Sequence, residues 1–323
     1  MKILITGVAG FIGFSTANSL LKNNKNTVLG IDNFDNYYST KYKRLRVNFL
    51  KKKKNFYFKK LDITKKNKLY DLFSKKNFDL VIHFAAQAGV RYSLINPKKY
   101  IAVNKNGFKF LLDAIIKNKI PKRIIYASSS SVYGNSQNFP TKEIQKLKPQ
   151  NIYAKTKISN EQLAIKYKKK YNLNICGLRF FTVYGEWGRP DMFLFKLLKA
   201  YKNNKSFYLN NYGNHLRDFT YIKDACKILK KLIYSKFKHR HLILNICSNK
   251  PLKLTNIIKM IDNLTLNKPK IKKISMHKAD IYKTHGDNSL VKKITGVKKF
   301  TDTSIGLKNT IEWIIKNKDT INL

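Results

Sequence analysis

Short apolar runs alternate along the chain with longer segments in which apolar and polar residues mix. The first run, Lys2–Thr6, is apolar and β-branched, and a glycine loop and an amphipathic helix to about Asn23 are predicted after it. Two further helices are predicted, from Lys98 to Lys117 and from Tyr153 to about Lys170. The other predicted strands are Thr27–Ile31, Phe56–Ile63, Leu80–Ala86, Arg123–Ala127 and Asn174–Phe180. This alternation predicts an α/β fold with a doubly wound parallel sheet.

The pattern loosens after Phe181, where shorter elements replace the regular alternation. The elements predicted there are a helix from Pro190 to about Asn203, a strand near Phe207, a run Arg217–Ile222, a strand Leu242–Ile246 and a helix around Ile305 to Lys316. We therefore expect a nucleotide-binding Rossmann domain over residues 1–180. A smaller substrate-binding α/β domain is expected over residues 181–323, with segments that return to the main sheet.

The loop after the first strand has a Gly-x-x-Gly-x-x-Gly spacing. Its glycines are Gly7, Gly10 and Gly13, and Phe11 and Ile12 lie between the last two. Glycines allow the backbone to approach a pyrophosphate, and the N-terminus of the following helix offers free N–H groups. In a strand–loop–helix setting this spacing predicts a dinucleotide site.

The next strand ends in Asp32, about 20 positions after the glycines. A carboxylate there can accept hydrogen bonds from the adenosine ribose and repels a 2′-phosphate. The following residue is Asn33 and not an arginine. The sequence therefore favours NAD over NADP.

Tyr153 and Lys157 are four positions apart, so they share one face of the predicted helix. A nearby ammonium favours the phenolate and lowers the pKa of a tyrosine, which then serves as a general acid/base. Ser128–Ser131 end the strand just upstream, where open α/β sheets place their ligands. Together these residues predict catalysis at that edge of the sheet.

The bulk composition excludes several classes of protein. Of the 323 residues 43% are hydrophobic, so a large core is expected, and no apolar run approaches the roughly 18 residues that span a membrane. We expect no signal peptide, because the N-terminus enters a strand-like run at once. The cysteines, Cys176, Cys226 and Cys247, are scattered, which fits a cytoplasmic location and no metal site. His239 and His241 lack companions that would complete a metal site.

The formal net charge of +48 raises the question of a nucleic-acid partner. Lysine is spread over the whole chain, however, and with asparagine and isoleucine it has the pattern of a general composition bias. The run Lys51–Lys54 is interpreted as a solvated turn. We expect no specific nucleic-acid partner, only weak binding at low salt.

Longer stretches resemble the nucleotide-sugar epimerases of the extended short-chain dehydrogenase/reductase family. The resemblance covers nearly the whole chain, and the last two of the stretches that follow resemble the uronate branch. The stretches are Gly7–Gly13 (GVAGFIG), Asp32–Asn33, Ala127–Gly134 (ASSSSVYG), Tyr153–Lys157 (YAKTK), Arg217–Ile222 (RDFTYI), His83–Ser93 (HFAAQAGVRYS) and Leu178–Met192 (LRFFTVYGEWGRPDM).

The resemblance implies a role for each matching residue. Tyr153 is expected to be the base at the C4 hydroxyl, Lys157 to hold the nicotinamide ribose, and Ser129 to bond the C4 oxygen, with Ser128 and Ser130 as competitors. Arg217 is expected to bind the diphosphate. The other cofactor contacts implied are Asp32, Asn33 and Asn36 at the ribose, Asp62 and Ile63 at the adenine, and Phe84, Ala85, Ala86, Asn104 and Phe181 at the nicotinamide.

The activity implied is NAD-dependent C4 epimerisation of UDP-glucuronate to UDP-galacturonate through a transient 4-keto sugar, for surface polysaccharide. Related decarboxylases and dehydratases carry an acidic residue just after the serine or threonine of the fifth strand. The segment Ser128–Gly134 has none, which favours plain epimerisation. The family commonly dimerises through helices that correspond to Lys98–Lys117 and Tyr153–Lys170, so a homodimer is expected.

Carboxylate recognition is assigned by hypothesis to Arg91, Thr182 and Arg189, because arginine pairs with carboxylates in a bidentate manner. Diphosphate-binding or surface arginines are the alternative. An alanine, Ala279, replaces the family's usual glycine before Asp280, which leaves the role of that segment open. Two other functions stay open: epimerisation of UDP-glucose or a UDP-N-acetylhexosamine, and non-catalytic binding of NAD or nucleic acid.

Overall fold

A parallel sheet of seven strands forms the centre of the molecule. The computed structural model describes residues 1–119, 123–235, 241–265, 268–277 and 280–317. Within them the strand order is β10-β6-β5-β4-β1-β2-β3, so the chain reverses direction across the sheet between β1 and β4. The strands are β1 (Lys2–Thr6), β2 (Thr27–Asp32), β3 (Phe56–Lys60), β4 (Leu80–His83), β5 (Arg123–Ser129), β6 (Asn174–Phe180) and β10 (Leu242–Ile246). The doubly wound parallel sheet predicted from the sequence is confirmed.

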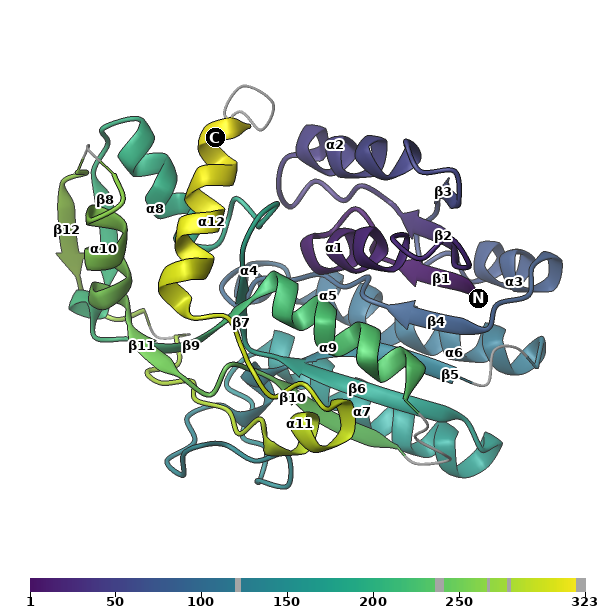
Figure 1. The fold of residues 1–323 in the computed structure, drawn as a ribbon. Coiled ribbons are helices and arrows are strands. Elements are labelled where there is room, and N and C mark those ends of the chain that lie inside the picture. The colour runs from purple at the N-terminus through teal and green to yellow at the C-terminus, as the bar shows by residue number, and fades with distance from the viewer. Residues whose placement is uncertain (120–122, 236–240, 266–267, 278–279, 318–323) are drawn as a thin grey trace.

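Helices cover both faces of this sheet (Figure 1). One layer consists of α1 (Phe11–Leu20), α2 (Thr40–Lys51), α9 (Ile222–Tyr234) and α11 (Ser289–Thr295). The other consists of α3 (Lys66–Lys75), α6 (Gly107–Lys117) and α7 (Ile152–Tyr171).

Alternate side chains of each strand point to opposite layers, as the geometry of a strand requires. In β1, Ile3 and Ile5 pack in the core with α1 and α9, whereas Leu4 packs with α3 and α6. Both faces are apolar because helices cover both, which explains the continuous apolar runs in the sequence.

Two smaller sheets form a second lobe beside the seven-stranded sheet (Figure 1). β7 (Thr182–Tyr184), β9 (Leu216–Tyr221) and β11 (Pro251–Lys253) make one sheet, and β8 (Phe207–Asn210) and β12 (Ile271–Ile274) make another. The helices of this lobe are α8 (Phe193–Lys202), α10 (Leu254–Asp262) and α12 (Thr303–Lys316). β10 pairs with β6 in the main sheet. The division at residues 180 and 181 stays a prediction.

Several boundaries differ from the prediction. The single helix expected from Lys98 to Lys117 is α5 (Pro97–Tyr100), a π-helical turn η1 (Ile101–Asn106) and then α6. The strand expected to reach Ile63 ends at Lys60. The helix expected from Pro190 begins at Phe193, because Met192 is extended. The helices α2, α3, α9, α10 and α11 were not predicted. The shorter helical segments α4 (Tyr92–Ile95), η2 (Ser130–Tyr133) and η3 (Asn211–Gly213) were not predicted either.

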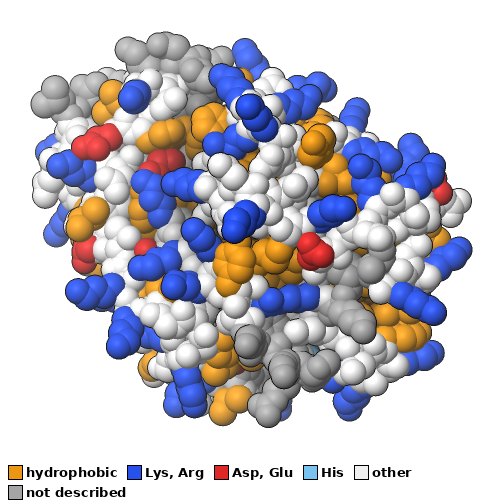
Figure 2. Space-filling view, turned by 45° about the vertical axis from the view of Figure 1, so that its right-hand side comes forward, with side chains coloured by type: hydrophobic (Ala, Val, Ile, Leu, Met, Phe, Trp, Pro, Cys, Tyr) orange, Lys and Arg blue, Asp and Glu red, His pale blue; other side chains and the backbone are white. Residues whose placement is uncertain are grey.

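The surface carries lysine and arginine side chains over the whole of the face in Figure 2, without one continuous strip. Cys176, Cys226 and Cys247 are buried, free thiols. Among the helices of the described ranges, none is long and apolar enough to cross a membrane.

Candidate active site

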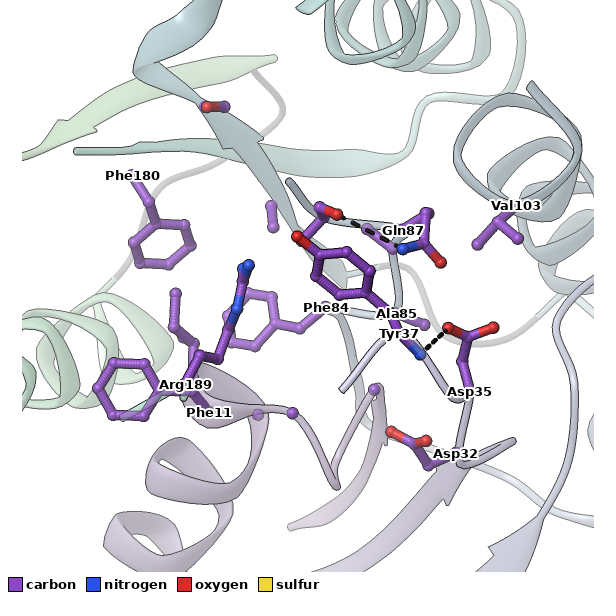
Figure 3. A pocket seen from close by; sticks show the side chains of 18 of the residues that line it. Phe11, Asp32, Asp35, Tyr37, Phe84, Ala85, Gln87, Val103, Phe180 and Arg189 are labelled. Atoms are coloured by element: carbon purple, nitrogen blue, oxygen red, sulfur yellow. Dashed lines mark hydrogen bonds between the residues drawn. The ribbon is translucent and has the colours of Figure 1, made fainter. Parts of the chain in front are cut away.

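A pocket of about 260 Å³ opens at the carboxyl ends of the central strands. It lies at the neighbouring strands β1 and β4, between which the strand order reverses. This is the place at which doubly wound folds bind their ligands. Figure 3 shows Asp32 and Asp35 on one side of the pocket, and Phe180 and Arg189 on the other. The predicted site residues that line it are Gly7, Gly10, Phe11, Ile12, Gly13, Asp32, Asn33, Ile63, Phe84, Ala85, Ala86, Ser128, Ser129, Tyr153, Lys157, Phe181 and Arg189.

The glycine loop forms one wall and leaves no space for larger side chains. A Cβ atom on Gly7 would lie 2.5 Å from the backbone N of Ala85, and the φ angle of Gly7 is +72°. A Cβ atom on Gly13 would lie 2.2 Å from the carbonyl oxygen of Gly7. Within the described chain, no side chain caps the first turn of α1. This cradle with an uncapped helix N-terminus fits a pyrophosphate.

Asp32 lies beside the glycine loop at the end of β2. Its carboxylate accepts hydrogen bonds from the backbone N–H groups of Ala9, at 3.1 Å, and Phe34, at 2.8 Å. Burial raises the pKa of Asp32, while these bonds and the charge of Lys43 act against that rise. A carboxylate held in this way can accept the hydroxyl groups of a ribose.

Tyr153, Lys157 and Ser129 meet on the opposite wall. Tyr153 and Lys157 lie on one face of α7, with the Lys157 ammonium 5.7 Å from the centre of the tyrosine ring. Lys157 also donates a 2.8 Å hydrogen bond to the carbonyl oxygen of Ala127 in β5. Ser129, at the end of β5, lies close enough to Tyr153 to lower the pKa of its phenol. The helix and the strand thus bring the three predicted catalytic side chains together.

The pKa of Tyr153 differs from the expectation. Burial raises it above the ordinary value, and the Ser129 hydroxyl and the charge of Arg189 only partly offset that effect. Burial also lowers the pKa of Lys157 to about 8, against the opposing charge of Glu161. In the protein alone, desolvation therefore outweighs the groups that favour the phenolate, and Tyr153 is a phenol at neutral pH.

Ser128 lines the pocket, but its hydroxyl is bound within the protein. Its hydroxyl donates a 2.5 Å hydrogen bond to Glu161, which also pairs with Arg179 at 2.9 and 2.7 Å. The side chains of Glu161 and Arg179 are 6% and 5% exposed, so this is a buried ion pair beneath the pocket. Ser131 donates to Ser129 at 2.9 Å, and Ser130 is not among the lining residues. Of the four serines, Ser129 is best placed to contact a ligand.

Asn104 supports the pocket without lining it. It is buried, and its amide accepts from the backbone N of Gln87 at 2.7 Å and donates to Gln87 O and to Thr156 Oγ1, both at 3.1 Å. Its side chain therefore joins η1, the loop after β4 and α7. The resemblance implied a nicotinamide contact for this residue, whereas its polar atoms are used within the protein.

The two arginines proposed for carboxylate recognition both pair with aspartates. Arg189 binds Asp191 through Nε and Nη2, at 3.0 and 2.5 Å. Arg91 binds Asp280 in the same bidentate manner, at 3.2 and 2.8 Å. Arg189 lines the main pocket, but Arg91 and Asp280 lie in a neighbouring hollow of about 700 Å³.

Four other predicted residues lie outside the main pocket. Thr182 lines a small cavity next to it, together with Arg189. Arg217 donates to the backbone carbonyl oxygens of Leu216, Ile281 and Tyr282, which ties β9 to the segment after Asp280. Asn36 is exposed. Asp62 accepts hydrogen bonds from Asn33 and Thr64.

Other lining residues were not predicted. Tyr37, Lys43, Asp35, Gln87 and Met192 all contribute to the main pocket. Lys43 is one of many lysines, so no sequence signal separates it from solvated ones. Gln87 and Met192 lie inside stretches that carry the family resemblance, which was the available signal.

The part of the chain that the structure describes contains no cluster of three His, Cys, Asp or Glu side chains suited to a metal. His241 lies 3.1 Å from the Tyr126 hydroxyl, within hydrogen-bonding distance. His239 and Ala279, on which two of the expectations rest, are outside the described residues.

Comparison with known proteins places this geometry in a family. An uncharacterised protein of Methanocaldococcus jannaschii is 41% identical over 98% of this chain and 97% of its own length. The UDP-glucuronate 4-epimerase of Thermodesulfobacterium geofontis is 38% identical, with coverage of 98% and 97%. The crystal structure of UDP-glucuronic acid 4-epimerase from Bacillus cereus, in complex with UDP-glucuronic acid and NAD, is 30% identical, with a TM-score of 0.91 and coverage of 98% and 99%. The model of the NAD dependent epimerase/dehydratase family matches residues 3–247, and the chain belongs to that family.

Proposed function

We propose that this protein is an isomerase that converts UDP-glucuronate to UDP-galacturonate by NAD-dependent epimerisation at C4. The observation that carries the proposal is one pocket that contains the glycine cradle, the Ser129–Tyr153–Lys157 group and Arg189. The relatives named for this reaction match almost the full length of the chain. Because Arg189 adds a partly buried guanidinium to the pocket that holds the reacting groups, the pocket suits a sugar that carries a carboxylate.

The cofactor fits the residues present. The uncapped turn of α1 and the glycines would hold the pyrophosphate of NAD, and Asp32 its adenosine ribose. Bound NAD supplies the group that takes hydride from C4 of the sugar and returns it. Since the cofactor is regenerated in each cycle, it is expected to stay bound through purification.

The catalytic residues handle the proton and the oxygen at C4. Tyr153 accepts the proton of the C4 hydroxyl and returns it after the sugar has turned, and Ser129 holds the C4 oxygen. Lys157 orients the nicotinamide ribose and provides the positive charge that favours the phenolate. Since burial raises the pKa of Tyr153 in the protein alone, charge that arrives with the ligands is needed for deprotonation.

A 4-keto uronate is a β-keto acid, which readily loses carbon dioxide. The segment after Ser129 carries no carboxylate, and the nearby carboxylate of Glu161 is bound by Arg179 and Ser128. Among the described residues that line the pocket near Ser129, there is therefore no free carboxyl group that could assist decarboxylation. This favours epimerisation alone.

The second candidate is epimerisation of a neutral sugar nucleotide, UDP-glucose or a UDP-N-acetylhexosamine. A solved neighbour, UDP-N-acetylglucosamine 4-epimerase from Methanobrevibacter ruminantium, is 26% identical with a TM-score of 0.87. A non-catalytic protein that binds NAD or nucleic acid is the third, and salt-resistant DNA binding would support it.

A substrate panel with an Arg189→Ala variant tests the choice among sugars. For the uronate, KM is expected to rise about 10- to 100-fold in the variant, because a charge-assisted bidentate contact is lost. For UDP-glucose KM is expected to change little. Equal effects on both substrates would contradict carboxylate recognition by Arg189.

The cellular setting is part of the same proposal. We place the reaction in the cytoplasm, in polysaccharide synthesis, because the three described thiols are unpaired and buried and because sugar nucleotides are the substrates of polymer assembly.

A further inference from the structure

Arg189 and Asp191 form a closed ion pair at the rim of the active site. The fork of Arg189 contacts both oxygens of Asp191, and the Tyr37 hydroxyl donates a third bond to Asp191 Oδ2 at 3.1 Å. Both charged side chains are 21% exposed. The carboxylate of Asp191, two residues further along the chain, thus already occupies the hydrogen-bond donors of Arg189 that are proposed to bind the substrate.

This latch, which consists of Tyr37, Arg189 and Asp191, stands between two hollows. Arg189 lines the main pocket, Asp191 lines the neighbouring hollow of about 700 Å³, and Tyr37 lines both. That hollow also contains Lys196, Lys199 and Lys205, whose charges suit a diphosphate. A sugar nucleotide whose diphosphate lies there and whose sugar reaches Tyr153 has to pass the latch.

Charge and burial favour a direct exchange, in which Arg189 changes its partner from Asp191 to the substrate carboxylate without an unpaired state. Burial raises the pKa of Asp191, but Arg189 and the Tyr37 hydroxyl act more strongly in the other direction, so its pKa is lowered and it is ionised at neutral pH. Leaving a partly buried guanidinium without a partner is costly. A uronate can replace Asp191 on Arg189 with the same geometry, whereas a neutral sugar cannot.

We infer that Asp191 takes the place of the substrate carboxylate: it pairs with Arg189 whenever no sugar acid is bound to that arginine. The inference rests on the proposed function. Asp191 is then a positioning residue that sets substrate affinity and turnover together. Asp191 pairs with Arg189 before the substrate binds, and the substrate carboxylate then replaces it. Asp191 pairs with Arg189 again while the 4-keto sugar turns and when the product leaves.

An Asp191→Asn variant tests this role, because asparagine keeps the shape and removes the charge. KM for UDP-glucuronate is expected to fall about tenfold, since the substrate no longer competes with an internal carboxylate for a charge-assisted pair. The kcat value is expected to fall several-fold as well, because the carboxylate then leaves Arg189 without a replacement. Tyr37→Phe, which removes only one bond of the latch, is expected to lower KM by a smaller factor.

The matched control is Asp262→Asn, which removes the same charge from α10, where Asp262 accepts a hydrogen bond from Tyr201 and lines neither of the two hollows. KM and kcat of the control are expected to equal those of the wild type. A raised or unchanged KM in Asp191→Asn would overturn the inference, since Asp191 would then only orient Arg189 or have no effect on it.

Failure of the inference is separable from failure of the proposed function. Turnover of UDP-glucuronate by the wild type decides the function. Calorimetric titration of both proteins with UDP-glucuronate decides the inference even without turnover: tighter binding to Asp191→Asn supports the role of Asp191, and equal or weaker binding overturns it. Circular dichroism spectra of the variants establish that they are folded.

Discussion

Lys157 is a buried cation whose charge state depends on one carboxylate. Burial lowers its pKa to about 8, and the charge of Glu161, one turn further along α7, acts against that shift. Tyr153, Lys157 and Glu161 follow one another at four-residue intervals on the same helix face. The ammonium required in the proposed mechanism is therefore present at neutral pH and is lost as the pH rises through about 8.

We predict that kcat/KM falls on the alkaline side with a midpoint near pH 8. The sign follows from the lowered pKa: the folded protein gives up the Lys157 proton at lower pH than a free lysine does. In Glu161→Gln the midpoint is expected to move to lower pH, whereas Glu312→Gln, an exposed change on α12, is expected to leave it in place. A kcat/KM value that rises with pH around pH 8 would instead report the ionisation of Tyr153. It would contradict the assignment of the pH dependence to Lys157.

The chemical groups of the site could be predicted from short motifs, but their partners could not. Tyr153, Lys157 and the glycines have fixed spacings within single elements. Arg91 and Arg189 were chosen by type, and a sequence does not show that Asp280, 189 positions from Arg91, pairs with it. The rise in the pKa of Tyr153 likewise depends on burial by several elements, which a spacing cannot convey.

At the scale of elements, the π-helical turn η1 sets the position of one supporting side chain. The wider turn at Ile101–Asn106 is an irregularity that often occurs at functional sites. It places Asn104 where its amide satisfies both backbone groups of Gln87 and reaches Thr156 in α7. The loop that lines the pocket after β4 is thereby fixed to the catalytic helix.

Replacement of Asn104 by leucine is predicted to lower the free energy of unfolding by about 2 to 6 kcal/mol. The reason is that two buried backbone groups of Gln87 lose their partner, at about 1–3 kcal/mol each. Asn118→Ala, which removes a bond to Ala114 at the end of α6, is the control and is expected to cost less than about 1 kcal/mol. Urea denaturation measures both. Similar small losses for the two variants would show that Asn104 does not support the loop.

The strands of the large sheet were predictable because strands buried on both faces are continuously apolar, whereas α2, α3, α9, α10 and α11 were not predicted. Boundaries were less predictable, since they depend on backbone geometry: Met192 is extended, so α8 starts at Phe193 and not at Pro190. Nothing in the residues of Lys98–Lys117 indicated a π turn, and the bonds of Asn104 to Gln87 and Thr156 that accompany it join residues far apart in the sequence.

At the scale of the whole molecule, η1 and α7 carry exposed apolar side chains on the outer layer of helices. Ile165 on α7 is 40% exposed and Ile101 in η1 is 44% exposed. These helices correspond to the pair through which the family is expected to dimerise. A second copy of the chain on this face would remove that apolar area from water.

Static light scattering is predicted to give the mass of a dimer at working concentration. Ile165→Asp is expected to dissociate it, because a carboxylate would be desolvated in the interface. Ile305→Asp, at a 54% exposed position on α12, is expected to leave the dimer intact. A monomeric wild type, or dissociation by the control alone, would contradict the proposed interface.

The central claim is epimerisation of UDP-glucuronate with retained cofactor, and one incubation tests it most directly. Purified protein is mixed with UDP-glucuronate without added NAD, and the nucleotide products and carbon dioxide are measured. The account predicts UDP-galacturonate, with neither carbon dioxide nor a pentose nucleotide. A pentose nucleotide, or no product even after NAD is added, would contradict it.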